Sequence, residues 1–322
     1  MPLDQADDAG GNDPARPSHD VVRALGERAL GLYVAHIVKD HLGGSNAVYF
    51  VALANGERLV VRVSPVGQSA LVERELWALN QARAYGAPVP EVIFAATTRH
   101  EYPAPYMVMR RLPGVPAFEV SLTPRTRATI LEQLGRHLLA IHSIPLAGFG
   151  YLELQNGVYI GRSSSWWAYV REEGERRLTK LPTAILPPPM AAAIERRFEQ
   201  TRTKRELDQA VLLHGDYQLK NILVQNLQVT GILDFENLLA GDPVLDFCAL
   251  HYWSRHPATT LRHLLRGYGR SPATQDFLWR LYRYELLLAL EILWWEDRLQ
   301  DRAGLRSALA RLARIVAILD TL

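Results

Sequence analysis

The chain has 322 residues, 48% hydrophobic and 22% charged, which is long enough for one large domain or two lobes with separate cores. A formal net charge of +2 argues against a nucleic-acid-binding protein, and the single cysteine, Cys248, excludes an internal disulfide. No apolar run reaches the roughly 18 residues of a membrane helix, and the N-terminus lacks a signal-peptide pattern, so we expect a cytoplasmic protein without a membrane partner.

The first third of the chain is expected to consist mostly of strands. Residues 1–18, rich in Asp, Gly, Asn and Pro, predict a disordered tail, and residues 20–38 have the apolar spacing of a helix. A second helix is expected over residues 69–86, ending at a glycine cap. Four runs rich in β-branched and aromatic residues are expected to be strands, the first two joined by a hairpin turn at Asn55-Gly56: 47–53, 58–64, 89–97 and 105–112.

The rest of the chain is expected to be mostly helical. From about Pro124 onward the apolar spacing is that of helices, except for a strand, loop and strand around residues 211–234. Strands early and helices late predict an α+β chain with a β-rich N-terminal lobe and a mostly helical C-terminal lobe. The expected parts are a tail at 1–18, an N-terminal lobe at 19–112 and a C-terminal lobe at 113–322.

The segment LLHGDYQLKNILV, residues 212–224, places polar residues between two apolar runs. Asp216 and Asn221 are separated by four residues, and Asp234 follows a second short apolar run, which is the order of a protein kinase catalytic loop. A carboxylate at Asp216 suits acceptance of a hydroxyl proton, and the oxygens of Asn221 and Asp234 suit Mg²⁺. The structural alternatives are turn residues at 216 and 221 and an edge-strand carboxylate at 234. The three residues together favour catalysis.

The segment HGDYQLKNIL, followed by ILDFENLLAGDPVLDF, resembles the aminoglycoside phosphotransferase and choline kinase-like family of small-molecule kinases. Other segments resemble the family in the same order: GGSNAVYFV, YGAPVPEVI, PYMVMRRLPG and LLAIHSIPLAGFG. GFG followed by SSSWWAYV is most similar to the hygromycin B phosphotransferase branch. The resemblance implies a bilobal protein-kinase-like fold, ATP (or GTP in its place) and Mg²⁺ as cofactors, and a small-molecule acceptor.

The resemblance also implies a nucleotide site in the N-terminal lobe. Val60 and Arg62 share one face of a strand, where the family places a small apolar residue over adenine and a lysine on the phosphates. This sequence has Arg62 where the family has the lysine, and a guanidinium is a planar group with several donors, whereas an ammonium is a compact point charge. Glu75 is the expected partner of Arg62, the alternative being a surface pair with Arg74 or Arg83. The other expected nucleotide contacts are Gly44, Ser45, Asn46, Val48, Met109, Arg111 and Leu223.

The acceptor site is expected on the C-terminal helices. Glu285 and Glu291 have only apolar or aromatic neighbours at helical spacing, so each, if buried, needs a cation from another segment or from a ligand. Tryptophans 253, 294 and 295 could stack on sugar rings or cations, although core packing is the favoured alternative for at least two of them. The predicted acceptor contacts are Glu236, Trp253, Glu285 and Glu291.

Three further polar residues are expected to be structural. His214 is expected in the core, bonded to the loop backbone, and Asp242 precedes a proline as a helix N-cap. Asp246 is expected to hold the catalytic loop from a helix, as its family counterpart does.

Together these patterns predict an ATP-dependent O-phosphotransferase, monomeric or homodimeric, acting on a small cationic or sugar-like molecule such as an aminoglycoside antibiotic. Two alternatives stay open. One is a metabolic kinase for an amino-alcohol, sugar or amino-acid hydroxyl. The other is a non-catalytic nucleotide-binding module, suggested by Arg62 and opposed by the presence of Asp216, Asn221 and Asp234.

Overall fold

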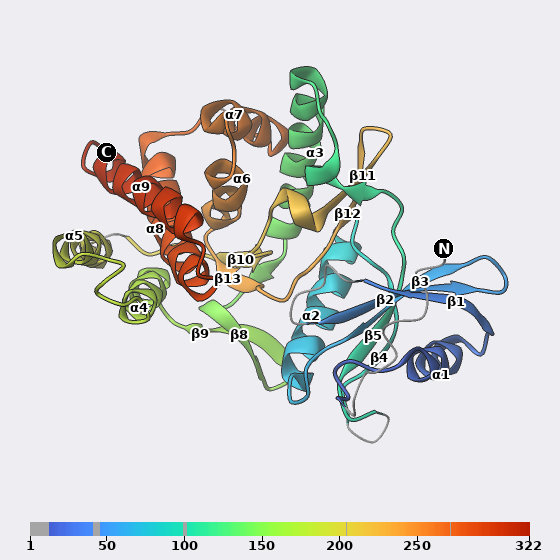
Figure 1. The fold of residues 1–322 in the computed structure, drawn as a ribbon. Coiled ribbons are helices and arrows are strands. Elements are labelled where there is room, and N and C mark those ends of the chain that lie inside the picture. Colours follow the sequence, from blue (N-terminus) through green and yellow to red (C-terminus); the bar gives the residue numbers. More distant parts are fainter. Residues whose placement is uncertain (1–12, 41–45, 99–101, 204, 271) are drawn as a thin grey trace. The chain divides into compact units, whose positions relative to one another are not determined.

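The computed structural model describes residues 13–40, 46–98, 102–203, 205–270 and 272–322 (Figure 1). The chain divides into two compact units. Unit 1 comprises Met1–Val115, Leu223–Gln225 and Thr230–Glu236, and unit 2 comprises Pro116–Ile222, Asn226–Val229 and Asn237–Leu322. The first division lies three residues from the expected lobe boundary. Two later segments return to unit 1, so Asp234 belongs to it.

Unit 1 is built on a five-stranded antiparallel sheet with the order β1-β2-β3-β5-β4. Side chains alternate along a strand, so the sheet has two faces, and each face packs against a different helix. Buried residues of one face pack with helix α1, and those of the other face pack with helix α2. The elements are α1 (His19–Leu30), β1 (Val34–Lys39), β2 (Ala47–Leu53), β3 (Arg58–Val63), α2 (Ser69–Ala84), β4 (Val92–Ala96) and β5 (Tyr106–Arg110). The predicted hairpin and the helix after it are confirmed.

Two predictions for the N-terminal segment are wrong. The helix expected over residues 20–38 ends at Leu30, because Gly31 takes a left-handed conformation (φ 66°), and residues 34–39 pair with β2. Residues 13–18 are ordered, since Pro17 is buried and its carbonyl accepts a hydrogen bond from the buried Tyr49 hydroxyl at 2.6 Å. Residues 1–12 of the predicted tail lie outside the described residues.

Unit 2 is mostly helical, as expected. Its longest helix, α8, has one buried face, which carries Leu286, Leu290 and Leu293. Gly135 of α3 lets helix α7 approach closely, since a Cβ there would lie 2.1 Å from the Leu264 carbonyl oxygen. The helices are α3 (Pro124–His142), α4 (Trp166–Thr179), α5 (Pro188–Glu199), α6 (Cys248–Tyr252), α7 (Pro257–Gly267), α8 (Gln275–Arg298) and α9 (Arg302–Leu319). None of the helices in the described ranges is long and apolar enough to cross a membrane.

Unit 2 also contains strands that the sequence reading missed. β8 (Phe149–Gln155) and β9 (Val158–Ser163) form a hairpin that turns at Asn156 and Gly157, with φ values of 51° and 80°. They belong to a five-stranded sheet with the order β7-β10-β13-β8-β9, where β7 is Pro145–Leu146, β10 is Ala210–Leu213 and β13 is Leu239–Gly241. The Asn-Gly signal used for the first hairpin was also present here.

A third, smaller sheet has the order β12-β11-β6. Its strands are β6 (Val115–Pro116), β11 (Ile222–Gln225) and β12 (Gln228–Ile232). Short 3-10 helices complete the chain: η1 (Ala117–Glu119), η2 (Gln200–Thr203), η3 (Leu219–Asn221) and η4 (Pro243–Phe247). Two of these, η3 and η4, carry the polar residues of the candidate site in unit 2.

Candidate functional site

The predicted catalytic loop, which carries Asp216 and Asn221, joins β10 to β11 and turns sharply at Gly215. Gly215 has a φ of 80°, and a Cβ at this position would lie 2.0 Å from the Asn237 carbonyl oxygen, so only glycine fits. His214 is fully buried, and its Nδ1 accepts a hydrogen bond from the Asp216 amide at 3.2 Å. This is the structural role expected for His214. The turn leaves the side chain of Asp216 20% exposed.

Asp246, in η4, holds this turn. Its carboxylate is buried and accepts hydrogen bonds from the amides of His214 (2.7 Å) and Gly215 (2.8 Å) and from Nε2 of His142 (3.0 Å). Burial alone would raise the pKa of Asp246, but His142, His214 and the Gly215 amide lower it. The Tyr268 hydroxyl lies 3.0 Å from the other ring nitrogen of His142. Asp246 therefore has the loop-holding role that the family resemblance implied.

The carboxylate of Asp216 is surrounded by donors from its own loop. Nδ2 of Asn221 lies 3.0 Å from Asp216 Oδ2 and 3.0 Å from the Asp216 carbonyl oxygen. Nε2 of Gln218 donates to Oδ1, and Nζ of Lys220 lies 3.3 Å from Oδ2. Because Asn221 uses its amide nitrogen toward Asp216, its amide oxygen stays available as a hard metal ligand.

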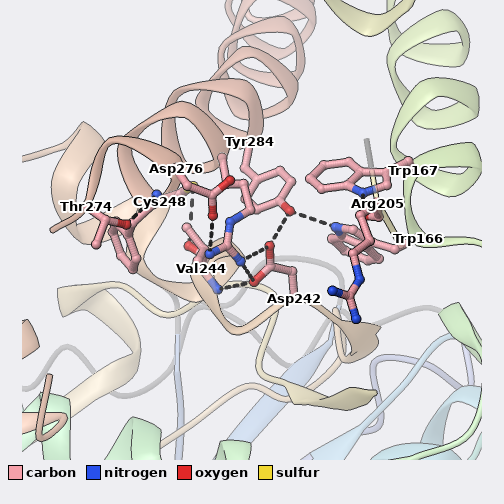
Figure 2. Close-up of polar contacts among 11 residues, drawn as sticks. Trp166, Trp167, Arg205, Asp242, Val244, Cys248, Thr274, Asp276 and Tyr284 are labelled. Atoms are coloured by element: carbon pink, nitrogen blue, oxygen red, sulfur yellow. Dashed lines mark hydrogen bonds and ion pairs between the residues drawn. The ribbon is translucent and has the colours of Figure 1, made fainter. Parts of the chain in front are cut away.

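A second network holds η4 to the helices of unit 2 (Figure 2). Asp242 caps η4 through the Val244 amide, as predicted, at 3.0 Å. The same carboxylate accepts hydrogen bonds from the Tyr284 hydroxyl at 2.6 Å and from Nη1 of Arg280 at 2.9 Å. Nε1 of Trp166 donates to the Tyr284 hydroxyl at 2.7 Å, which brings in α4. Since η4 also carries Asp246, α8 is linked through η4 to the catalytic loop.

In unit 1, Arg62 forms the expected pair with Glu75. Arg62 is 9% exposed and Glu75 is 3% exposed, and Arg62 Nη1 donates to Glu75 Oε1 at 2.8 Å. Burial alone would lower the pKa of Arg62, but Glu75, with Asp234 and Glu236, raises it. Nε of Arg62 is buried and has no acceptor among the described residues. The buried pair with Glu75 holds the guanidinium in place and keeps its positive charge.

Asp234 and Glu236 lie beside this pair in unit 1. Asp234 has a φ of 68°, a strained conformation for a non-glycine residue that is typical of functional sites. Glu236 accepts a hydrogen bond from Nδ2 of Asn46 at 3.1 Å, and burial followed by repulsion from Asp234 raises its pKa. Nη2 of Arg74 lies 3.4 Å from the Glu236 carbonyl oxygen. Glu236, an expected acceptor contact, thus has contacts with Asn46 and Arg74 within unit 1.

The expected base-binding residues share a sheet face. Val60 lies opposite Met109 in the β3–β5 pairing, and Val48 lies opposite Arg62 in the β2–β3 pairing. Met109 and Val60 belong to the apolar cluster packed against α2. The Arg111 guanidinium lies 4.2 Å from the ring centre of Phe50. Arg111 also lines a cavity with Arg58, Leu112, Pro113, Gly114 and Gln225.

The remaining nucleotide-side residues are placed only in part. Leu223 belongs to unit 1 and packs close to Gly231, where an added Cβ would lie 3.1 Å from its Cδ1. Gly44 and Ser45, predicted in the phosphate loop, lie outside the described residues.

Glu285 and Glu291, the predicted acceptor contacts, both have a partner on another segment, which was the alternative to a ligand. Glu285 is buried, but His251 Nδ1 lies 2.6 Å from its Oε1, so it has a partner within the protein. The side chain of Glu291 is 47% exposed, and its Oε2 lies 3.0 Å from Nη1 of Arg177. The spacing along α8 revealed the absence of a partner on the same helix, but it could not reveal partners on α4 and α6.

The expectation that at least two of the three tryptophans pack in the core is wrong. Trp253 is 54% exposed and Trp295 is 50% exposed, while Trp294 lies under Lys180 and Arg298. Trp253 therefore keeps an accessible ring.

Several polar residues of the site were missed in the sequence. Gln218 and Lys220 lie within the loop at two and four positions after Asp216, a spacing that was visible. His142 follows a predicted helix, and Arg280 lies on α8, but neither had a local signal for its distant carboxylate partner. No group of three or more His, Cys, Asp or Glu suited to a metal ion occurs in the described part of the chain.

The fold and the loop define a phosphotransferase that acts on a hydroxyl group, built on the protein-kinase-like fold. The chain belongs to the phosphotransferase enzyme family APH, whose family model matches residues 36–285.

Solved structures of the same fold come from several small-molecule kinases. The aminoglycoside phosphotransferase APH(4)-Ia is 17% identical, with 93% of this chain and 99% of that chain covered and a TM-score of 0.72. A predicted fructosamine-3-kinase of Thermobifida fusca is 18% identical, with 93% and 99% covered and a TM-score of 0.67. The macrolide 2'-phosphotransferase MphH of Brachybacterium faecium is 18% identical, with 91% and 98% covered and a TM-score of 0.61. A thermostable APH(4)-Ia variant of the same fold forms a ternary complex with ADP and hygromycin B, at 18% identity, 92% and 98% coverage and a TM-score of 0.70.

Proposed function

We propose that the chain transfers the γ-phosphoryl group of ATP to a hydroxyl of a small sugar-like molecule, with an aminoglycoside as the first acceptor to test. The observation that carries this proposal is the partly exposed Asp216 carboxylate, held by Asn221 and Gln218 on a turn that buried Asp246 supports. A carboxylate that is fixed but reachable is what an acceptor hydroxyl requires for orientation and proton removal. The membership in the phosphotransferase family supports the same reaction.

Asp216 is the proposed base. Its carboxylate accepts the hydroxyl proton while the hydroxyl oxygen bonds to the γ-phosphorus and the bond from phosphorus to the ADP oxygen breaks. The Asp246 contacts fix the backbone on both sides of the turn, so the carboxylate is oriented before the acceptor arrives.

The nucleotide is proposed to bind unit 1. The face carrying Val48, Val60 and Met109 offers an apolar surface for the base, and Arg62, held by Glu75, supplies positive charge on the same face for the phosphates. We propose that Gly44, Ser45 and Asn46 cover the phosphates and that Arg111 and Leu223 complete the base site.

Magnesium is the proposed metal. The free amide oxygen of Asn221 and the carboxylate of Asp234 are hard oxygen ligands of the kind it prefers. When bound, Mg²⁺ would neutralise charge on the phosphate oxygens.

The acceptor class is supported by the fold and by an exposed aromatic ring. Trp253, 54% exposed, is a surface on which a sugar ring or a cation could stack. The kinases of similar fold act on aminoglycosides, a macrolide and, by prediction, fructosamines. A metabolic kinase for an amino-alcohol, sugar or amino-acid hydroxyl is therefore the second candidate. Cytoplasmic location and a monomeric or dimeric state stay predictions.

The test is a phosphotransfer screen over aminoglycosides, macrolides and common hydroxyl metabolites, with ATP and with GTP. Asp216→Asn is the matched variant, expected to bind nucleotide like the wild type but to turn over about two to four orders of magnitude more slowly. A non-catalytic module would show a nucleotide-dependent rise in melting temperature and no transfer to any acceptor. Growth of a sensitive strain on the best antibiotic acceptor would then test a role in resistance.

A further inference from the structure

The catalytic loop contains a cation that the proposed mechanism has not used. Nζ of Lys220 lies 3.3 Å from Oδ2 of Asp216, four residues earlier in the chain. Lys220 lies in the short helix η3, and the loop between Asp216 and this helix brings the two side chains together. A positive charge thus lies next to the carboxylate that is proposed to receive the acceptor hydroxyl.

This ion pair has little value for stability. The side chain of Lys220 is 55% exposed, and solvent screens an exposed pair of this kind so that it adds little to stability. The loop does not need Lys220 for its shape, because Asn221 bonds both the carboxylate and the carbonyl oxygen of Asp216, and Asp246 holds the backbone. Lys220 is therefore free to change partner without loss of the turn.

The chemistry of the proposed transfer provides that new partner. The acceptor hydroxyl must lie within hydrogen-bond distance of the Asp216 carboxylate, roughly 2.7 Å. The phosphorus atom bonds to this same hydroxyl oxygen, so the phosphoryl group comes close to the carboxylate that Nζ contacts and within reach of the flexible lysine side chain. An ammonium there would neutralise negative charge on the phosphoryl group, and its departure from Asp216 would leave the carboxylate free to take the proton.

We propose that Lys220 is a second catalytic residue, whose ammonium contacts the oxygens of the phosphoryl group while it passes to the acceptor. The inference rests on the proposed function. In the step, the acceptor oxygen forms its bond to phosphorus, the bond from phosphorus to ADP breaks with its electron pair leaving on ADP, and the proton passes to Asp216. Lys220 keeps its protons throughout and supplies only charge.

A lysine suits this role better than an arginine. Its ammonium is a compact charge on a flexible stem, which can turn from a carboxylate to a phosphoryl oxygen. Only four of the 36 basic residues in the chain are lysines, so a lysine at this loop position stands out from the composition.

The test compares three variants of the full chain with the best acceptor from the screen. Lys220→Met keeps the stem and removes the charge, and Lys220→Arg keeps a charge in a different shape. Arg266→Met is the matched control, since its Nη1 lies 3.4 Å from Glu132 Oε1 and its side chain is 74% exposed. Turnover number, Michaelis constants for both substrates, Mg-nucleotide affinity by calorimetry and melting temperature are measured for each.

If Lys220 acts on the phosphoryl group in the transition state, Lys220→Met lowers kcat about 10- to 1,000-fold. Both Michaelis constants stay within about threefold and the melting temperature within about 2 °C of the wild type. Lys220→Arg recovers part of the loss, and Arg266→Met behaves as the wild type.

Three results would overturn the proposal: a kcat for Lys220→Met within about threefold of the wild type, a loss confined to nucleotide affinity, or no recovery in Lys220→Arg. These failures differ from failure of the proposed function, in which the wild type itself phosphorylates no acceptor.

Discussion

The replacement of Asp246 by asparagine tests how the catalytic loop is held. Oδ2 of Asp246 accepts from the His214 amide and from His142, and Oδ1 accepts from the Gly215 amide. Asparagine has a single acceptor oxygen. Placed at the Oδ2 position, that oxygen keeps two of the bonds, while the amide group of asparagine faces the Gly215 N–H, donor against donor.

The expected cost follows from these contacts. A buried N–H without an acceptor costs about 1–3 kcal/mol, and loss of the negative charge weakens the two bonds that remain. The sum is about 3–5 kcal/mol, the range seen when one partner of a buried ion pair is removed. At roughly 2–4 °C for each kcal/mol, the melting temperature should fall by about 10 °C. Because Asp216 follows Gly215, we also expect turnover to fall about 100-fold in the folded variant.

The pH dependence of the stability provides a second, independent test of the role of Asp246. The pKa of Asp246 in the folded protein lies below its ordinary value, so its contribution to stability is present above about pH 4, the unfolded value. That contribution is lost as the pH falls through the lower folded pKa. The stability difference between wild type and Asp246→Asn should therefore be full at neutral pH and shrink below about pH 4.

The assay is thermal and urea unfolding across pH, with phosphotransfer kinetics at neutral pH. Asp276→Asn is the control, because this carboxylate is 64% exposed and pairs with Arg280 at the surface, and it should change stability by no more than about 0.5 kcal/mol. An Asp246→Asn protein that melts within about 2 °C of the wild type, with turnover within threefold, would refute the loop-holding role.

Three further predictions follow from the site. Asp234→Ala should remove the Mg²⁺-dependent part of nucleotide affinity, because Asn221 alone cannot hold the ion; calorimetry with and without Mg²⁺ checks this, and an unchanged response to Mg²⁺ would contradict the assignment. Glu236→Gln keeps the Asn46 hydrogen bond and removes a carboxylate whose pKa is raised by burial and by Asp234. A raised pKa means that ionisation of Glu236 weakens the folded state as the pH rises above about 4.3. The variant should therefore have a higher melting temperature than the wild type at pH 7 and the same melting temperature at pH 4. A lower melting temperature than the wild type at pH 7 would contradict this. Glu291→Gln removes an exposed pair with Arg177 and should change stability by less than about 1 kcal/mol and leave the acceptor Michaelis constant unaltered; a large rise in that constant would restore Glu291 as an acceptor contact.

Short-range features of the sequence predicted much of the site. The spacing of Asp216, Asn221 and Asp234 depends on one loop and the strands around it, so it is visible as a motif. The pairing of Arg62 with Glu75 was predictable for a similar reason, because a strand face and the next helix carry both residues. The hairpin after Asn55-Gly56 depends only on local turn chemistry.

Contacts between distant segments were decided by the tertiary structure. Glu285 finds His251 and Glu291 finds Arg177, while helical spacing along α8 reports only neighbours on that helix. The sequence could not show that Glu285 is buried and Glu291 is exposed, because both have apolar or aromatic neighbours along the helix.

The same limit applies to the loop itself. Asp246 lies 32 residues after His214 and 104 residues after His142, and only the packing of η4 brings the three together. A motif therefore identifies which residues have the right chemistry, whereas burial and partners come from segments that the chain folds together, and these determine how each group is held and charged.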